Sequence, residues 1–466
     1  MIDNNLLDTI TDPKFRAICE ETIAEMKRLP IPGAVVGVWH EGQAQVAPLG
    51  ITNIDHPLPV TADTLFQIGS ITKTYVATAV MRLVETGQLE LDRPIRTYLP
   101  DLKLADETAA AGVTMRHLLT HTGGWVGDYF NDFGLGTDAL SRMVDQVAGL
   151  AQLTPLGTVW SYNNAGFYLA GRVLERVTGQ TFEQAMQQLV LEPLGLTNSY
   201  FFAHDLMTHR FAVGHKVVKG QPQVARPWAL GRAAHPAGGI VSSMKDLLRY
   251  GRFHLGNGHL GNGLTESGQR LLSPDALRQM QSPLLPASGL DMTGLAWRVT
   301  EVNGTTMIGH GGATNGQKAL LRLVPAAQFA VAVLTNSDDG NILAHHLVNK
   351  ATEQYLGLRL PAAEPLHLSA EQLAPYLGRY EAAMTIYELA LADGQLSLHT
   401  TPKGGFPTPD APPPEAPPPL RAALYDEDRL IVLEEPLKEA RGEFVRDENG
   451  RIAWLRLGGR IHARTP

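Results

Sequence analysis

The spacing of apolar residues divides the first 360 residues into a helical middle flanked by segments with strand character. Residues 11–26 place apolar side chains on one helical face, with Thr11 or Asp12 as the cap. Residues 33–50, "GAVVGVWHEGQAQVAPLG", contain two apolar runs parted by Glu41-Gly42-Gln43, which predicts a β-hairpin. From Ser70 to about Leu255 the periodicity is mostly helical.

The helical middle carries its own start and stop signals. "NAGFYLAGRVLERVTG" predicts a helix that ends with Gly179 as its C-cap. "SMKDLLRYGRF" predicts another, with Ser243 and Asp246 placed as a capping box. These signals predict a lobe built from helices.

Strand character returns after residue 290. "GLAWRVTEV", "TTMIGHGG", "KALLRLV" and "QFAVAVLTN" predict four strands, and a short turn at residues 325–327 joins the last two. Strands so close in sequence should pair antiparallel. "NILAHHLVNKATEQYLGL" then predicts a helix, which we expect beside the N-terminal helix on one sheet. The fold class is therefore α+β: an antiparallel sheet flanked by helices, plus an all-helical lobe.

The spacing of turn-forming residues changes near "RLPAAEPLHLSAEQL", which predicts two domains, residues 1–360 and 366–466. Turn signals at residues 393–394, 426–428 and 449–450 separate short strands, as in a small all-β meander or barrel. Within it, "FPTPDAPPPEAPPPL" around Pro412 cannot supply sheet donors, and we expect an extended, polyproline-like, solvated loop whose role stays open.

Composition excludes several classes. The chain has 466 residues, a formal net charge of -8 and no basic block, so a nucleic-acid partner is not expected. Cys19 is the single cysteine and lies in a pattern that predicts a buried helix position; internal disulfides and cysteine zinc clusters are excluded. No apolar run approaches the roughly twenty residues of a membrane span, and no signal peptide is seen. We expect a cytoplasmic protein, or a periplasmic one if a leader was removed.

Ser70 and Lys73 are three residues apart in "FQIGSITKTYVATAVMRLVETGQL". Residues at this spacing share a helix face, so the lysine ammonium can lie beside the serine hydroxyl. A partly desolvated lysine can activate a serine nucleophile, and a helix N-terminus favours a developing oxyanion. The alternative for Ser70 is a simple N-cap.

Two further motifs combine with this pair. Tyr162 and Asn164 in "WSYNNAGF" precede a helix, where the alternative is a packed aromatic followed by an Asn cap. His310 in "IGHGGATNG" ends a predicted strand and is followed by Gly311 and Gly312, which permit close approach of a ligand to the backbone; the alternative is a hairpin turn.

Together, Ser70-Ile71-Thr72-Lys73, Tyr162-Asn163-Asn164 and His310-Gly311-Gly312 resemble the signature of the serine beta-lactamase and penicillin-binding-protein superfamily. The flanks "RHLLTHTGGW", "LEPLGLTNSYF" and "PAGGIVSSMKDLLRYG" resemble its class C-like, D-aminopeptidase and esterase branch. The resemblance covers about residues 10–357 and implies a beta-lactamase-like fold. The C-terminal segment resembles a lipocalin-like β domain, on "LAPYLGRYE" and the strand-turn pattern.

The resemblance implies a role for each motif residue. Ser70 would be the acylated nucleophile, Lys73 its activator and Tyr162 the general base that also protonates the leaving group; whether Lys73 or Tyr162 is the resting base stays open. Asn164 would bind a substrate carbonyl or position Lys73. Backbone N–H groups of Ser70 and Ala313 would form the oxyanion hole, with His310, Gly311 and Gly312 lining the substrate site. No metal or cofactor is expected.

Departures from the family pattern bear on the substrate. His310 stands where a lysine would offer a permanent cation, and a histidine with a pKa of about 6.5 is mostly neutral at pH 7. This disfavours a true beta-lactamase and favours a peptidase of small or D-amino-acid-containing peptides, with a carboxylesterase or a non-turnover acyl-binding scaffold as alternatives. His117 and His121 are spaced like a zinc pair, but without a third ligand they are interpreted as packing and capping residues. A homo-oligomer is compatible with the sequence.

Overall fold

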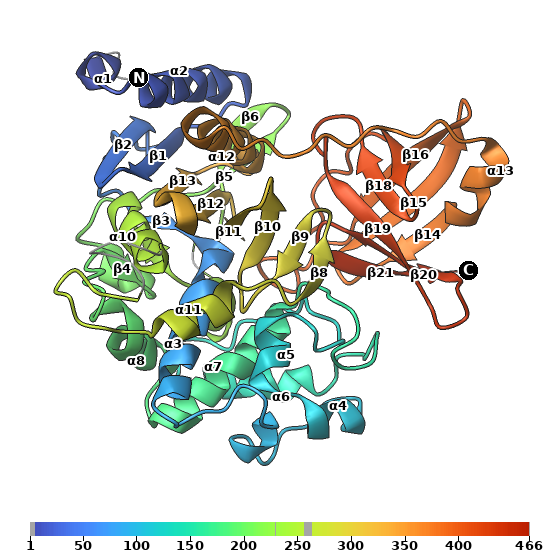
Figure 1. Cartoon of the computed structure of the whole chain (residues 1–466), viewed down its shortest axis with the longest axis horizontal. Helices are drawn as coiled ribbons and strands as arrows, with labels where there is room; N and C mark the ends of the chain where they lie inside the picture. The colour runs from blue at the N-terminus through green and yellow to red at the C-terminus, as the bar shows by residue number, and fades with distance from the viewer. Residues whose placement is uncertain (1–4, 229, 256–262, 466) are drawn as a thin grey trace.

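The computed structural model describes residues 5–228, 230–255 and 263–465. Its largest sheet is antiparallel, with the strand order β2-β1-β13-β12-β11-β10-β9-β8 (Figure 1). The strands are β1 Gly33–His40, β2 Gln43–Gly50, β8 Leu285–Ser288, β9 Asp291–Thr293, β10 Arg298–Val302, β11 Thr305–Thr314, β12 Gln317–Val324 and β13 Phe329–Thr335. The predicted hairpin and the antiparallel pairing of the later strands are confirmed.

Helices α2 (Pro13–Arg28) and α12 (Gly340–Leu356) cover one face of this sheet and share one apolar cluster with it. Asp12 caps α2 by accepting a hydrogen bond from the Lys14 N–H at 2.8 Å. Phe15 and Cys19 are fully buried, as the sequence predicts. Each large apolar side chain buried here contributes about 1.5–3 kcal/mol, which fixes both helices on the sheet.

The opposite face is covered by α10 (Met244–His254), which packs against β1 and β13, and beyond it lies the predicted helical lobe. Gly179 caps α7 (Asn164–Thr178) in the left-handed conformation, with φ of 70°, as predicted. The capping box of α10 is half right. Ser243 accepts from the Asp246 N–H, but the Asp246 carboxylate instead accepts from Asn198 N–H at 2.7 Å and the Ser199 hydroxyl at 2.9 Å. A tertiary contact thus replaces the local one.

The other helices are α1 Asn5–Thr9, α3 Thr72–Glu85, α4 Glu107–Gly112, α5 Met115–Leu119, α6 Ala139–Val147, α7 Asn164–Thr178, α8 Phe182–Met186, α9 His235–Gly238, α11 Pro274–Gln281 and α13 Ala370–Leu373. Two small sheets join β3 Phe66–Gln67, β7 Val241–Ser242 and β4 Ser199–Tyr200, and β5 His215–Val218 with β6 Gln221–Val224. The α+β prediction is confirmed.

The C-terminal strands close into an eight-stranded antiparallel barrel, because β14 pairs with both β15 and β21. Its strands are β14 Gly378–Glu381, β15 Thr385–Ala392, β16 Gln395–Pro402, β17 Leu420–Asp426, β18 Arg429–Val432, β19 Arg441–Arg446, β20 Ile452–Leu457 and β21 Arg460–Thr465. Alternate residues fill it with an apolar cluster of its own. The predicted all-β barrel is confirmed, while the domain limits 1–360 and 366–466 stay a prediction.

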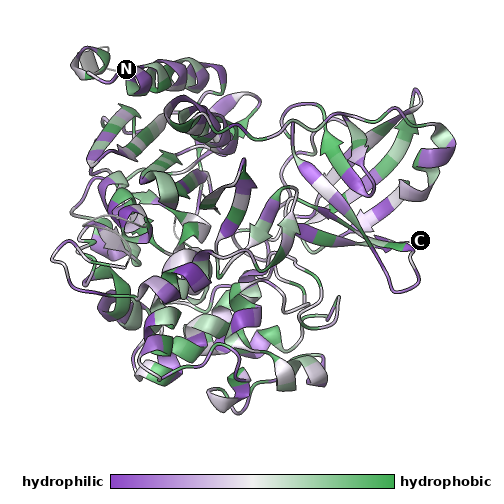
Figure 2. Cartoon of the chain, viewed as in Figure 1, coloured by the Kyte–Doolittle hydropathy of each residue, from purple (hydrophilic) through white to green (hydrophobic). Residues whose placement is uncertain are grey.

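Hydropathy follows these layers: apolar residues concentrate in the sheet, the lobe helices and the barrel strands, and polar residues on the outer loops (Figure 2). Within the described ranges, every helix is too short or too polar to cross a membrane.

The proline-rich segment between β16 and β17 is a loop, as predicted, but part of it is not solvated. Phe406 packs edge-on against Phe130 of the lobe, with ring centres 4.9 Å apart. The exposed residues of the segment are 409–410, 412–416 and 418–419. The expectation of a purely solvated insertion is therefore wrong for the part around Phe406, where an aromatic contact ties the barrel to the lobe.

Candidate functional site

Ser70 lies in a single 3-10 turn, Gly69–Ile71, that leads directly into α3. Lys73 stands one turn later on the same face, and its Nζ donates a hydrogen bond of 3.1 Å to Ser70 Oγ. The N-cap of α3 is Ile71, which makes no side-chain cap. The predicted serine–lysine geometry is therefore present, and the simple capping alternative for Ser70 is wrong.

Lys73 is completely buried. Within the described residues, its Nζ donates one further hydrogen bond, to the carbonyl oxygen of Ala237. Burial holds the pKa of Lys73 well below its usual range, since an ammonium loses its hydration there; the Arg460 cation adds to this effect and Asp128 opposes it. A lysine with a lowered pKa can be neutral near physiological pH and accept a proton from Ser70.

Tyr162 lies just before α7, with its ring centre 5.0 Å from Lys73 Nζ. Burial raises the pKa of Tyr162 to about 12, although the Ser70 hydroxyl and two arginine cations act in the opposite direction. The phenol oxygen is buried, and the Ser70 hydroxyl is close enough to affect its acidity without standard hydrogen-bond geometry. Ser70, Lys73 and Tyr162 therefore converge on one buried point.

The two asparagines after Tyr162 have different roles. Asn163 is the N-cap of α7, because its side chain accepts from the Gly166 N–H at 2.8 Å. Asn164 is the first residue of the helix, and its Nδ2 donates to Asp128 Oδ1 at 2.8 Å. Capping thus explains Asn163 and leaves Asn164 for the site.

His310, Gly311 and Gly312 lie on β11, which is longer than its neighbour β10. Pairing with β10 stops where Gly309 meets Arg298, so the outer edge of β11 beyond that point is free of β10. This segment instead runs beside the Ser70 turn. The motif is therefore strand rather than hairpin turn, and it offers backbone donors toward Ser70.

The approach of this edge to the Ser70 turn requires glycine on both sides. A Cβ on Gly69, whose φ is +50°, would lie 2.6 Å from the Ala313 nitrogen, and a Cβ on Gly312 would lie 1.9 Å from the Ile68 carbonyl oxygen. Real Cβ atoms do not approach so closely, so either side chain would separate the strand from the turn. The backbone of Gly312 and Ala313 thereby lies against the backbone of Ile68 and Gly69, next to Ser70.

His310 is 5% exposed, and its ring centre lies 6.1 Å from that of Tyr162. Burial, together with the nearby Lys73 charge, lowers the pKa of His310 to about 3, although the Gly311 carbonyl acts in the opposite direction. His310 is therefore neutral at pH 7, with Nδ1 2.6 Å from the Gly311 carbonyl oxygen. The sequence-based expectation of a neutral group at this position agrees with its burial.

Four residues that the motifs did not reveal also face this point: His121, Asp128, Arg298 and Arg460. His121 accepts the Asn163 N–H through Nδ1 at 3.0 Å, and its ring lies 4.4 Å from that of Tyr162. It follows the end of α5 rather than packing within it. His117 does cap α5, as predicted, in a capping box with Thr114. The four residues come from separate segments, so spacing carried no signal for them.

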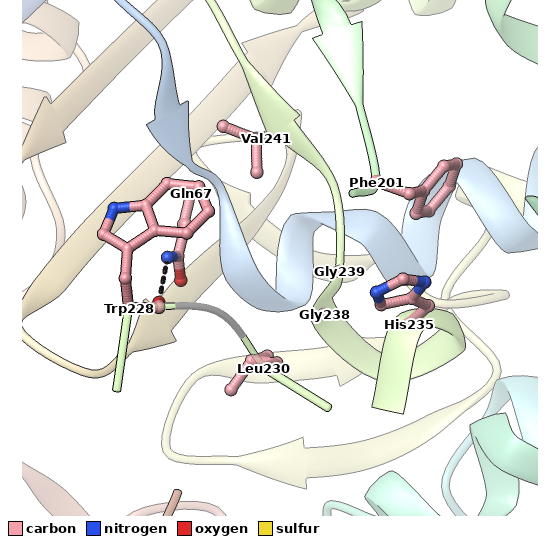
Figure 3. A pocket seen from close by; sticks show the side chains of 8 residues that line it. All are labelled: Gln67, Phe201, Trp228, Leu230, His235, Gly238, Gly239 and Val241. Atoms are coloured by element: carbon pink, nitrogen blue, oxygen red, sulfur yellow. Dashed lines mark hydrogen bonds between the residues drawn. The ribbon is translucent and has the colours of Figure 1, made fainter. Parts of the chain in front are cut away.

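A small cavity lies beside the Ser70 turn, between Trp228 and Leu230 on one side and Phe201 and His235 on the other (Figure 3). A Cβ on Gly238, which lines it, would lie 3.4 Å from the Gly69 carbonyl carbon. At about 10 Å³ it holds about one water molecule. It is too small for a substrate side chain and does not identify the substrate site.

Comparison with known proteins agrees with this geometry. A family model described as Beta-lactamase matches residues 20–351. The chain is 34% identical to "Penicillin-binding protein 4" of Amycolatopsis lactamdurans over 360 residues, covering 75% of this chain and 93% of the relative. It is also 34% identical over 229 residues to "Esterase EstB" of Burkholderia gladioli, covering 46% of this chain and 56% of that protein.

The similarity to one solved structure extends through the barrel. The crystal structure of SurE matches with a TM-score of 0.75 and 26% identity, covering 97% of this chain and 99% of that chain. SurE has also been solved with D-Leu. The matched protein therefore shares both the sheet-and-helix body and the C-terminal barrel.

Proposed function

The chain belongs to the beta-lactamase family, and on that premise we propose that it is a serine hydrolase that cleaves amide or ester bonds through an acyl-enzyme on Ser70. The observation that carries the proposal is the 3.1 Å contact between Ser70 Oγ and the Nζ of a fully buried Lys73. A free serine hydroxyl is a poor nucleophile, and an adjacent amine with a lowered pKa supplies the missing base.

The proposed reaction has two halves. Ser70 Oγ attacks the substrate carbonyl carbon while its proton passes to Lys73 or Tyr162; the backbone N–H groups of Ser70 and Ala313 stabilise the oxyanion. The C–N or C–O bond then breaks as the leaving group takes a proton from Tyr162. Water attacks the acyl-enzyme, its proton returns through the same groups, and the acid and free Ser70 are released. Which of Lys73 and Tyr162 is the resting base stays open, because both side chains lie beside the Ser70 hydroxyl.

We propose short peptides, including those with D-amino acids, as the substrate class. The neutral His310 and the D-Leu bound to SurE support this choice. A carboxylesterase is the second candidate, supported by the similarity to Esterase EstB. The absence of a lysine at position 310 weakens the case for beta-lactamase activity, although Arg298 and Arg460 supply fixed positive charge that the motifs did not reveal.

The Asn164 side chain and the β11 edge from His310 to Ala313 would bind the substrate. We further propose that the barrel shapes access to this site or joins protomers, because Phe406 of its proline-rich loop contacts the lobe at Phe130.

Two experiments test the function. Intact mass spectrometry after treatment with a fluorophosphonate should show one adduct in the parent chain and in Ser267→Ala, an exposed control, and none in Ser70→Ala. Labelling that persists in Ser70→Ala would remove the nucleophile assignment.

The second experiment is a substrate panel of p-nitrophenyl esters, D- and L-amino-acid p-nitroanilides, D-Ala-D-Ala peptides and nitrocefin. Short esters and at least one amide class should be hydrolysed faster than nitrocefin. Efficient nitrocefin turnover alone would contradict the substrate class. A stable adduct without turnover of any substrate would favour an acyl-binding scaffold.

A further inference from the structure

The hairpin between β20 and β21 of the barrel reaches the Tyr162 segment of the lobe. The Gly459 carbonyl oxygen accepts the Tyr162 N–H at 2.8 Å, and the Ile461 N–H donates to Ser161 Oγ at 3.2 Å. Gly459 has φ of +79°, and a Cβ there would come within 3.3 Å of Arg298. The backbone on both sides of Arg460 is thus held against the segment that carries Tyr162.

Arg460 itself forms a two-pronged ion pair with Asp128. Its Nε lies 2.9 Å from Oδ2 and its Nη2 3.1 Å from Oδ1. The Asp128 side chain is only 6% exposed, whereas that of Arg460 is 37% exposed. Oδ1 of the same carboxylate also accepts the Asn164 amide. A nearly buried carboxylate is costly without a cation, so the barrel provides the partner that Asp128 requires.

The guanidinium also lies against the general-base candidate. Its Cζ is 4.7 Å from the centre of the Tyr162 ring, and Lys73 Nζ is 5.0 Å from the same centre. A cation at this distance favours the phenolate of Tyr162 and the neutral amine of Lys73, whereas the Asp128 carboxylate disfavours both.

The other groups that face Tyr162 are His121 after α5, His310 on β11 and Arg298 on β10. Burial holds the pKa of both histidines low, so they are neutral at pH 7. Arg298 is a fixed cation that forms an ion pair with Asp291 at 3.7 Å. The Asp128–Arg460 pair is the ion pair near Tyr162 that joins the lobe to the barrel, and removal of either side chain leaves the charge of the other unpaired.

We propose that Arg460 is a positioning residue of the active site: through its ion pair with Asp128 it sets the charge around Lys73 and Tyr162 and holds Asn164 in place. The hydrolase site is then incomplete without the barrel. This inference rests on the proposed hydrolase function, and it assigns the barrel a part in tuning the chemistry beyond access or assembly.

The sign of the charge effect gives the test. Arg460→Gln removes a positive charge and leaves Asp128 unpaired, so proton loss from the Lys73–Tyr162 pair becomes harder and the rising limb of activity moves to higher pH. Asp128→Asn removes the negative charge and moves the limb to lower pH. Each shift should be about one pH unit at these separations. The double variant keeps the net charge and should return the limb close to the parent position.

The measurement is the rate of Ser70 phosphonylation by a fluorophosphonate between pH 5 and 10.5, with kcat/KM for a short p-nitrophenyl ester in parallel. Arg460→Lys keeps the charge and should leave the limb in place. Arg464→Gln is the control, because Arg464 lies on the same strand but donates to Leu377 O within the barrel. Circular dichroism checks that each variant folds.

Opposite shifts for Arg460→Gln and Asp128→Asn are expected. Limbs that stay in place, or that move in the same direction, would overturn the proposal even if activity falls, since a purely structural pair gives no opposite signs. If Arg460→Gln fails to fold, Asp128→Asn alone decides the question: its rising limb of activity must move to lower pH. Parent labelling at Ser70 separates the two ideas, because unshifted limbs in an enzyme labelled at Ser70 refute only the role of Arg460. Absence of that labelling removes both.

Discussion

Gly312→Ala tests whether the Ala313 N–H is an oxyanion donor, because this substitution separates the donor from Ser70 without touching a reactive group. The new Cβ would lie 1.9 Å from the Ile68 carbonyl oxygen. Strand and turn must part by roughly 1.5 Å to restore an ordinary contact. A hydrogen bond to an oxyanion shared by the Ser70 and Ala313 N–H groups would then exceed the roughly 3.5 Å at which such bonds fail.

Loss of one such donor should lower kcat by about 10²–10³, or roughly 3–4 kcal/mol of transition-state stabilisation. The matched control is Gly311→Ala, one residue earlier on β11, whose Cβ would meet nothing closer than 3.8 Å. Both variants are assayed by steady-state hydrolysis of a p-nitrophenyl ester, with thermal unfolding followed by circular dichroism. We expect kcat to fall in Gly312→Ala while KM changes little. Gly311→Ala, which adds a side chain to the substrate-binding edge without displacing the strand, should keep the parent kcat even if its KM changes.

One result would refute the reasoning: a folded Gly312→Ala that keeps the kcat of the parent. In that case the β11 edge would not supply the oxyanion donor. Equal losses in both variants would point instead to a general sensitivity of the strand.

Three other predictions concern different parts of the molecule. Because burial lowers the pKa of Lys73, kcat/KM for ester hydrolysis should reach its plateau well below the ordinary lysine pKa of about 10.4; a plateau reached only at or above that value would contradict a lysine base. Burial opposes ionisation of Glu183, but hydrogen bonds from His235 and Arg232 outweigh it and lower the pKa of Glu183 to about 2. A carboxyl group whose pKa is lowered on folding stabilises the folded state at pH values above its ordinary pKa of about 4.5. This stabilisation is lost as the pH falls toward 2. Glu183→Gln should therefore cost on the order of 2 kcal/mol in urea unfolding at pH 7 and progressively less below pH 4.5, whereas exposed Glu192→Gln should cost nothing at either pH. Phe406→Ala should increase kcat/KM for long p-nitrophenyl esters relative to the acetate, because the loop loses its contact with Phe130, whereas Leu391→Ala, exposed on the barrel, should not; identical selectivity in both variants would show that the loop does not limit access.

Local signals in the sequence were sufficient for much of the fold. Asp12 before α2 and Gly179 after α7 are read from neighbours within a few residues, and hairpins such as β1–β2 follow from alternation around a tight turn. The half-wrong capping box of α10 marks the limit of this reasoning: Asp246 finds its partners at Asn198 and Ser199, which no local pattern can indicate.

The same limit applies to the site. Ser70 and Lys73 are three residues apart on one helix, so their contact follows from helix geometry and was predictable. The approach of the His310–Ala313 edge to that turn could be expected only through the family resemblance, since more than two hundred residues separate them. The order of these two segments along the chain does not tell how far apart they lie in space.

The sequence by itself determined the contact between Ser70 and Lys73, the elements that carry it and the existence of an all-β C-terminal segment, because each rests on periodicity or on residues close along the chain. Only the tertiary structure decided the charge around that pair. Asp128, Arg298 and Arg460 come from a loop, the main sheet and the barrel, and the Asp128–Arg460 ion pair depends on how the barrel meets the lobe. Burial, which lowers the pKa of both Lys73 and His310, is likewise a property of the packed whole, since desolvation is produced by every surrounding layer at once.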